Sequence, residues 1–414
     1  MVFKKTVHLY GPAFTVSGYG VHTRLILDSL LDNDLYDVKL IPSRWGNTPN
    51  SKQYINKYKQ YVLMHKPEVQ PDIFIMVTVP DEMQRAGTLN ILVSAITESD
   101  ICSTEAILGA NKADLVLVPS NFTKNILQNT RYEQTNPQTG EKTILQCSVP
   151  VEVLHEGINI DTFTKNPNYN FPLNIPESFA FLFVGTWVSG QMGEDRKDIG
   201  MLIKTFLTTF SGKKEAPALV LKTNYAGYSE LERESIITNI QYIIDDVGKH
   251  KSRLPNVYLI FGELTDSEMN DLYNNPKVKC FVSFTKGEGY GLPLAEFSLT
   301  GKPIIVPNYS GYLDFLLPDY NLLLPGSLTT IHPSAANKWI HKDGKWFTVN
   351  YSVASSVLKN MYEKYDEFLI RSRKQPKHIR DNFSYKSMCD NFYKILDKYS
   401  KNWSKIVFPK ITKI

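Results

Sequence analysis

The stretch KGEGYGLPLAE, residues 286–296, places two glutamates, Glu288 and Glu296, on either side of a glycine-rich turn. An apolar run, VKCFVSF (278–284), comes just before it and is typical of a buried strand. Residues 292–300 predict a helix, with a proline in the first turn and Gly301 as a left-handed stop after its end. The pattern therefore predicts a strand, a sharp turn and a helix.

This turn has the features of an anion site flanked by two carboxylates. The amides of Tyr290, Gly291 and Leu292 have no helical partner, and the start of a helix favours negative charge. Glu288 and Glu296 suit hydroxyl groups instead of phosphate, because an ionised carboxylate only accepts hydrogen bonds. A diphosphate between two hydroxyl-rich rings, a nucleotide sugar, satisfies all these groups. The alternative is an ordinary strand–turn–helix whose glutamates only cap the helix and face solvent.

The surrounding chain alternates short apolar runs with amphipathic stretches, and this pattern starts again after residues 161–178, which are rich in Asn and Pro. Continuous apolar strands separated by helices are typical of parallel sheets covered on both faces. We predict an α/β protein with two doubly wound Rossmann-like domains facing across a cleft, where ligands of such sheets bind. The expected parts are two α/β domains (1–165 and 166–360) and a helical basic segment (361–414).

Two segments do not fit the alternating pattern. Residues 129–146 are polar and resemble an insertion, and residues 326–352 are long, aromatic and basic. Long irregular segments in compact domains are usually functional or mobile. The sequence leaves both readings open for these two.

Composition indicates a globular protein of more than one domain. The chain has 414 residues, of which 42% are hydrophobic and 21% charged. Its 4 cysteines are far apart, without the spacing of a metal site or a disulfide framework, so we expect reduced core residues in a cytoplasmic protein. No stretch has the length of a membrane span, and the start lacks the pattern of a signal peptide.

The net charge of +4 is unevenly distributed. Residues 371–414 contain 12 Lys or Arg and 3 Asp, a formal charge of +9, whereas residues 1–370 carry −5. A basic end of this kind favours contact with an anionic surface, either nucleic acid or acidic lipid. The alternative is a solvated terminal helix. We therefore expect a cytoplasmic protein that is free, peripheral to a membrane or associated with DNA, in the host cytoplasm if it is encoded by a phage.

The stretch EGYGLPLAE resembles the E-x7-E motif of retaining GT-B glycosyltransferases, in particular glycosyltransferase family 4, and a phage-type DNA-modifying member is one form this could take. Four other stretches resemble segments of that family: ADLVLVPSNFTKNIL (113–127), VLHEGINIDTF (153–163), FVGTW with RKDIGMLIKTF (183–206) and FGELTDSEMNDLYNN (261–275). The resemblance covers residues 6–325 and is more specific in the second half. It implies the GT-B fold and transfer of a sugar from a UDP or GDP donor without a further cofactor or metal. It also implies that residues 1–165 are an N-terminal acceptor domain, that residues 166–360 are a nucleotide-sugar domain, and that the segment 361–414 packs back towards the first domain.

The resemblance also implies roles for individual residues. Glu288 holds the transferred sugar and Glu296 the ribose, while the amides of Tyr290, Gly291 and Leu292 bind the diphosphate. Two further residues, Arg196 and Lys197, neutralise the leaving diphosphate.

The chain departs from the family at Thr186, where many members place an arginine directly after the strand glycine. We expect Arg196 to take the place of that arginine. Lys222, at the end of another apolar run, is a further candidate ligand of the phosphate, or an ordinary lysine at a strand end.

In the first domain, GPAFTVSGYGVHTR (11–24) again predicts strand, glycine loop and helix, and Gly18 and Gly20 allow close approach to the donor phosphate or the acceptor. The family often has a histidine after the strand that corresponds to residues 90–100. Here Thr97, Glu98 and Asp100 occupy that place, and Glu98 is our candidate for orienting or deprotonating the acceptor, with a helix cap as the alternative. His22 and His155 are weaker candidates.

The sequence leaves two classes of acceptor open. One is a glycan or lipid-linked saccharide, and the other is a hydroxymethylated base in DNA. A nucleotide-sugar epimerase or a non-catalytic nucleotide-sugar-binding module on the same fold are the alternative functions. The sequence indicates nothing about the oligomeric state.

Overall fold

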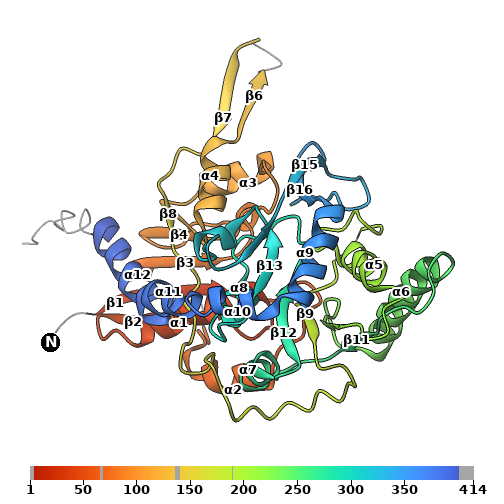
Figure 1. The fold of residues 1–414 in the computed structure, drawn as a ribbon. Coiled ribbons are helices and arrows are strands. Elements are labelled where there is room, and N and C mark those ends of the chain that lie inside the picture. The colour runs from red at the N-terminus through yellow and green to blue at the C-terminus, as the bar shows by residue number, and fades with distance from the viewer. Residues whose placement is uncertain (1–3, 66–68, 136–139, 189, 401–414) are drawn as a thin grey trace, which may run out of the picture.

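The computed structural model describes residues 4–65, 69–135, 140–188 and 190–400. Two parallel six-stranded sheets form its centre, one from each half of the chain (Figure 1). The strand order is β2-β1-β3-β4-β5-β8 in the first sheet and β11-β10-β9-β12-β13-β14 in the second. The predicted pair of doubly wound α/β domains is therefore confirmed.

The strands of both sheets are short and apolar, as strands covered on both faces must be. All five residues of β3 and of β4 are buried. The first sheet consists of β1 (Lys5–Gly11), β2 (Tyr36–Pro42), β3 (Ile73–Val77), β4 (Leu89–Val93), β5 (Leu115–Val118) and β8 (Val151–Val153). The second consists of β9 (Ala180–Val184), β10 (Ala218–Lys222), β11 (Val257–Ile260), β12 (Val278–Val282), β13 (Ile304–Pro307) and β14 (Leu322–Leu324).

Helices cover both faces of each sheet, so each domain has two apolar layers. The first domain contains α1 (Gly18–Leu31), α2 (Lys52–Tyr58), α3 (Thr104–Ala110) and α4 (Asn121–Asn129). The second contains α5 (Ile199–Phe210), α6 (Glu230–Gly248), α7 (Asp266–Asn274) and α8 (Leu292–Ser298). The last helices are α9 (Tyr351–Glu363), α10 (Tyr365–Ser372), α11 (Gln375–Asn382) and α12 (Tyr385–Ser400). Short 3-10 turns are η1 (Lys59–Tyr61), η2 (Pro80–Glu82) and η3 (Gly311–Asp314).

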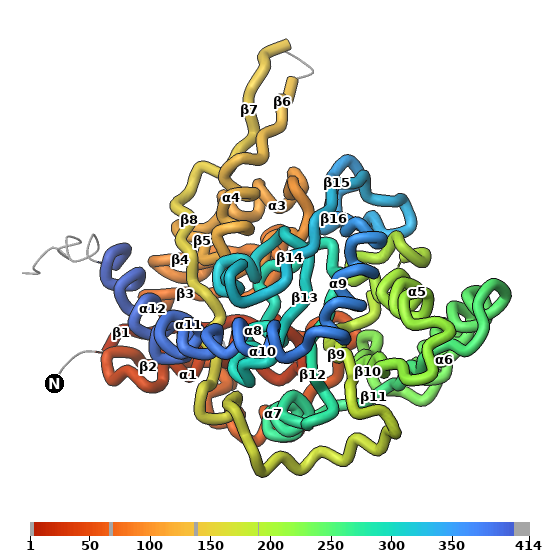
Figure 2. Tube along the Cα trace, in the orientation of Figure 1, coloured from red at the N-terminus to blue at the C-terminus, as the bar shows by residue number. Residues whose placement is uncertain are grey.

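The last helices cross from the second domain to the first. The blue end of the tube in Figure 2 runs from α9, beside the second sheet, to α12, beside β1 and β2. At the start of this path Phe179 packs edge-on against Tyr362 of α9, with 5.1 Å between ring centroids. At its end, Phe392 and Leu396 of α12 are fully buried in the apolar layer that contains β1 and α1. The chain thus joins the two domains twice.

Both irregular segments of the sequence form antiparallel hairpins. β6 (Arg131–Thr135) and β7 (Lys142–Gln146) make a mostly exposed arm that projects from the first domain (Figure 1). β15 (Gly326–Thr330) and β16 (Lys345–Val349) form the second hairpin. The latter contacts the first domain, because the Asp100 amide donates to the Lys345 carbonyl at 2.8 Å and the Lys345 amide to an Asp100 carboxylate oxygen at 2.6 Å. This hairpin is therefore a bridge between the domains.

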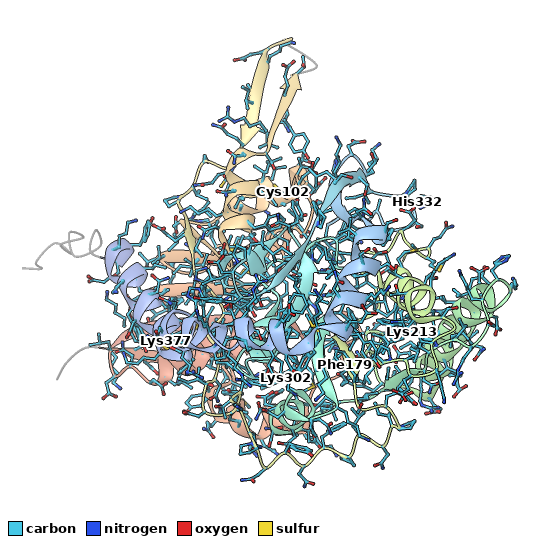
Figure 3. The ribbon with its side chains drawn as sticks, in the orientation of Figure 1. Cys102, Phe179, Lys213, Lys302, His332 and Lys377 are labelled. Carbon is cyan, nitrogen blue, oxygen red and sulfur yellow. The ribbon has the colours of Figure 1, made fainter. Side chains whose placement is uncertain are left out.

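The basic C-terminal segment is only partly described. Residues 371–400 fall on α10, α11 and α12, with Lys377 on α11 (Figure 3). The tail 401–414, which carries part of the predicted charge, lies outside the described residues. Within the described part of the chain, no helix has the length and apolar character needed to cross a bilayer.

We expect Phe392→Ala to lower the free energy of unfolding by about 3–5 kcal/mol, because truncating a buried Phe leaves a cavity. Exposed Lys394→Ala on the same helix is the matched control and should change stability by less than about 0.5 kcal/mol. Denaturant-induced unfolding measures both variants. Equal stability of the two would contradict the packing of α12 on the first domain.

Candidate functional site

The glycine-rich turn adopts the expected strand–turn–helix conformation. β12 ends at Val282 and α8 begins at Leu292, after Gly291 with φ of 97°. Gly301 follows the helix with φ of 72°, which confirms the predicted left-handed stop. Among the described residues, no protein acceptor pairs with the amides of Tyr290, Gly291 or Leu292. These amides are available to a ligand.

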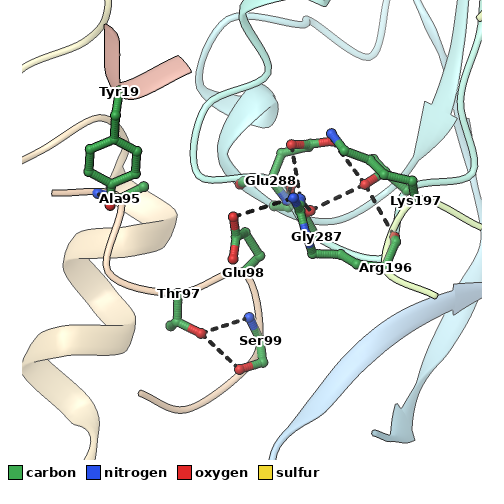
Figure 4. A network of polar contacts seen from close by, with 11 residues as sticks. Tyr19, Ala95, Thr97, Glu98, Ser99, Arg196, Lys197, Gly287 and Glu288 are labelled. Atoms are coloured by element: carbon green, nitrogen blue, oxygen red, sulfur yellow. Dashed lines mark hydrogen bonds and ion pairs between the residues drawn. The ribbon is translucent and has the colours of Figure 1, made fainter. Parts of the chain in front are cut away.

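Arg196 and Lys197 meet Glu288 from the opposite side. They lie just before α5, whose N-cap Asp198 has a left-handed conformation. Arg196 Nη1 lies 3.2 Å from Glu288 Oε2, and Lys197 Nζ contacts Glu288 Oε1 (Figure 4). Thr285 Oγ1 donates to the same Oε1 at 2.9 Å. The sequence thus brings three of the predicted site residues into one ion-paired cluster.

The side chains of this cluster are only 14–15% exposed, so their charges interact strongly. Burial acts to raise the pKa of Glu288, but Lys197 and Arg196 outweigh it and hold the pKa below its ordinary value. Burial lowers the pKa of Lys197 in spite of the Glu288 carboxylate. For Arg196, burial acts to lower the pKa, and the carboxylates of Glu98 and Glu288 raise it above its ordinary value. The cluster is an ionised, mutually dependent unit.

The first domain contacts this cluster through residues that follow β4 and β5. Glu98 Oε1 lies 3.7 Å from Arg196 Nη2, which makes Glu98 the fourth charge of the unit (Figure 4). Ser120 Oγ donates to the Gly289 carbonyl at 2.6 Å. A Cβ on Gly287 would lie 1.8 Å from the Glu98 carbonyl oxygen, so only glycine permits this approach of the two domains. The turn is therefore held by both domains.

A cavity of about 480 Å³ lies between the domains at this place. Glu288, Glu98, Arg196 and Lys197 line it, together with the turn from Gly289 to Leu294. Thr186, where the expected arginine is missing, also lines it. The volume is in the range of small-ligand sites.

Gly18 and Gly20 differ in position. Gly18 lines the cavity at the start of α1. The Gly20 amide donates to Ser17 Oγ at 3.0 Å, and a Cβ on Gly20 would lie 2.3 Å from the Thr15 carbonyl oxygen. Gly20 therefore permits the tight turn into α1.

Like Gly20, the predicted donor ligands Lys222 and Glu296 are not among the residues that line this cavity. Lys222 Nζ donates to the Gly262 carbonyl at 2.7 Å, and burial lowers its pKa to about 8. Glu296 accepts a hydrogen bond of 3.1 Å from the Tyr273 hydroxyl, and burial raises its pKa well above the ordinary range. Their roles as donor ligands stay predictions.

The weaker candidates have structural partners. Thr97 pairs with Ser99 through their hydroxyls at 2.9 Å (Figure 4), and Asp100 binds the second hairpin. His155 Nε2 lies 2.9 Å from Asp314 Oδ2, a contact between the domains. Among the described residues, no group of three or more His, Cys, Asp or Glu side chains is arranged to bind a metal ion.

No protein-family model and no curated protein sequence matches the chain. Solved structures do match it over nearly its whole length. Sucrose-phosphate synthase from Thermosynechococcus elongatus has a TM-score of 0.64 at 12% identity, covering 97% of this chain and 100% of that one. A glycosyltransferase from Rickettsia africae has a TM-score of 0.60 at 13% identity, and the match covers 96% of this chain and 99% of that one. HepE from Anabaena, in complex with UDP and glucose, has a TM-score of 0.57 at 12% identity, and the match covers 95% of this chain and 100% of that one.

The chain has the GT-B fold. At these identities the similarity concerns the fold alone. In that GT-B fold, the cavity described above lies between the two domains, where the sequence predicts the ligand.

Sequence reasoning missed one buried carboxyl group of this cavity, Glu156. It follows β8 and is 8% exposed, with Oε1 3.7 Å from Nδ1 of His22. Burial raises the pKa of Glu156 to about 8, and the nearby Glu288 adds to this. Burial lowers the pKa of His22 to about 4. Both groups are therefore neutral at pH 7. The quoted stretch VLHEGINIDTF contains Glu156, but nothing in its spacing distinguishes it from a solvated residue.

We expect Glu156→Gln to be more stable than the wild type at pH 8, and to lose this advantage towards pH 5. The folded chain keeps a proton on Glu156 up to about pH 8, whereas the ordinary pKa is 4.5, so the wild type loses stability as pH rises between these values. The gain at pH 8 should exceed about 1.4 kcal/mol, the equivalent of one pKa unit.

Glu152→Gln is a contrasting control for this experiment. Burial acts to raise the pKa of Glu152, but Lys398 and Tyr399 outweigh it and lower the pKa, so this carboxylate stabilises the fold above its ordinary pKa. The variant should be less stable than the wild type at pH 8. Unfolding curves at pH 5, 6.5 and 8 measure both differences, and a pH-independent effect of Glu156→Gln would contradict a neutral Glu156.

Proposed function

We propose that this protein transfers a sugar, with retention of configuration, from a nucleoside-diphosphate donor, UDP- or GDP-linked, to an acceptor hydroxyl. The observation that carries the proposal is one cavity lined by two buried cations, by the carboxylate that pairs with both, and by three amides that have no acceptor among the described residues. The cations and the amides suit a diphosphate, and the carboxylate suits sugar hydroxyls. HepE, which shares the fold, has a crystal structure in complex with UDP and glucose.

Glu288 has two roles in this proposal. Without a ligand it neutralises Arg196 and Lys197, which keeps two cations in a buried site at a tolerable cost. A bound diphosphate takes over both cations, since charge-assisted hydrogen bonds to phosphate are strong. The Glu288 carboxylate is then free to accept hydrogen bonds from the hydroxyls of the sugar. Because Glu156 is neutral, it adds no further negative charge to the site.

In the reaction, the bond between the anomeric carbon and the phosphate oxygen breaks, and its electron pair stays on that oxygen. The acceptor oxygen forms the new bond on the same face of the sugar, and its proton passes to the leaving phosphate. Arg196 and Lys197 stabilise the charge that develops on the diphosphate, the kind of electrostatic stabilisation that contributes most in enzymes. Glu98, 3.7 Å from Arg196, is placed to orient the acceptor hydroxyl from the first domain.

Two other functions are consistent with the fold. A nucleotide-sugar epimerase would interconvert donors without an acceptor, and a binding module would hold the donor without reaction. The ionised cluster favours transfer, because a binding module has no need of two buried cations at the leaving group. Mass spectrometry of glycans, plain DNA and hydroxymethylated DNA, incubated with a panel of UDP- and GDP-sugars, detects transfer as a gain in acceptor mass. Epimerisation changes no mass, so proton NMR of the nucleotide sugars after incubation distinguishes an epimerase from a binding module.

We expect Lys197→Ala to lower kcat/KM for transfer at least about 10-fold, equivalent to about 1.4 kcal/mol of transition-state stabilisation, and to weaken UDP binding. Lys204→Ala is the matched control on α5, because Lys204 pairs with Asp246 and does not line the cavity. Steady-state kinetics and calorimetric titration with UDP measure both effects. Wild-type rates in Lys197→Ala would exclude Lys197 as a ligand of the leaving group.

We expect Glu288→Gln to separate binding from transfer. Transfer should fall at least about 10-fold because the sugar loses its carboxylate, whereas UDP affinity should rise or stay unchanged because Arg196 and Lys197 lose their competing partner. The same two assays apply. Parallel losses of UDP affinity and transfer would contradict the two roles of Glu288.

A further inference from the structure

A second cavity of about 460 Å³ adjoins the first. We call it the aromatic chamber. Its rings are Tyr19, Trp45, Trp187, Tyr225, Trp339 and Trp346. Four of the 5 tryptophans of the whole chain therefore line one chamber, which is far from a chance distribution. Large aromatic surfaces of this kind bind the flat, apolar faces of rings.

The chamber opens directly onto the proposed transfer site. Glu98, Arg196 and Thr186 line both cavities, and so do Tyr19 and Tyr225. A molecule in the chamber therefore reaches the ion-paired cluster, and Glu98 stands at the junction. This is the position that an acceptor hydroxyl must take in the transfer proposed above.

The second hairpin completes the chamber. Trp339 and Ile340, from the segment between β15 and β16, form one side together with Trp346 of β16. Lys338 Nζ lies 3.0 Å from Asp81 Oδ2 of the first domain, which fixes this segment across the cleft. Trp339 is 45% exposed, so part of its ring surface is available to a ligand in the chamber.

Trp346 also has a polar group, its indole N–H. It is 1% exposed, lines the chamber, and its indole Nε1–H has no hydrogen-bond partner among the described residues. A buried donor without an acceptor is costly, and such groups usually find a partner in a ligand or water. A hydroxyl oxygen in the chamber would satisfy it.

The charges around the chamber favour a neutral occupant. Among the described residues that line the chamber, Arg196 is the one cation, and the transfer proposed above commits it to the diphosphate. Lys338, beside the chamber, is paired with Asp81. Binding to nucleic acid depends on cations that neutralise phosphates, and this lining offers none besides Arg196. A sugar ring combines an apolar face for the indoles with hydroxyls for Glu98, Asn337 and the Trp346 N–H.

We propose that the aromatic chamber binds the acceptor, and that the acceptor is a saccharide ring stacked against the tryptophans of the second hairpin. The proposal rests on the transfer function above and assigns its acceptor class. The hairpin is thus a specificity element contributed by the second domain. Trp339 is the residue that best separates acceptor binding from folding, because its side chain is partly exposed.

The test is saturation-transfer NMR on the full chain with methyl hexopyranosides and methyl disaccharides, with and without UDP. A duplex oligonucleotide that contains 5-hydroxymethylcytosine is the second probe. We expect at least one methyl glycoside to bind the wild type and Trp339→Ala to weaken that binding at least 10-fold. Trp339→Phe should restore most of it, because a phenyl ring still stacks. Exposed Tyr242→Ala on α6 is the matched control and should bind as the wild type does.

UDP affinity, measured by calorimetry, should be the same in all four proteins. Equal glycoside binding by Trp339→Ala, or no glycoside binding by a wild type that binds UDP, would overturn the chamber as a saccharide site. Loss of binding to the hydroxymethylated duplex in Trp339→Ala would overturn it in favour of an extruded base. A wild type that binds none of UDP, GDP and their sugars would instead refute the transfer function, whatever the Trp339 variants show.

Discussion

The contact of the Glu288 carboxylate with Arg196 and Lys197 is the interaction on which the site depends. Two cations in a largely buried cleft need a counter-charge, because an unpaired buried charge costs several kcal/mol. The carboxylate supplies it from the second domain's own turn, and Glu98 adds another from the first domain. In the proposed function, diphosphate binding is an exchange of anions at these two cations.

The two sheets hold the charged groups of this site in fixed positions. The turn follows β12, Arg196 and Lys197 precede α5, and Glu98 follows β4, so each group lies near the carboxyl end of a strand or the start of a helix. Contacts between the domains hold the turn in place: Ser120 binds the Gly289 carbonyl and Gly287 lies against the Glu98 backbone. Rigid elements of this kind position charges more precisely than free loops do.

The sequence predicts the fold well because strand and helix periods are strong local signals. It also predicts which residues join the cluster, since the turn at 286–291 and the pair at 196–197 adjoin recognisable elements. Glu156 could not be predicted, because its pKa depends on burial by residues distant in sequence. The tertiary partner of Lys222, the Gly262 carbonyl, is equally invisible in sequence. The chamber was hidden for the same reason, as Trp45, Trp187 and Trp339 come from separate parts of the chain and line one cavity only in the folded protein.

The return of α12 to the first sheet affects how the chain is made. Five buried side chains of α12, Met388, Cys389, Phe392, Ile395 and Leu396, belong to the apolar layer built by β1 and α1. A ribosome that has produced the first sheet must still produce more than half of the chain before that layer can close. The first domain therefore completes this apolar layer only after the second sheet has been synthesised, unlike a domain whose core comes from one continuous stretch of chain.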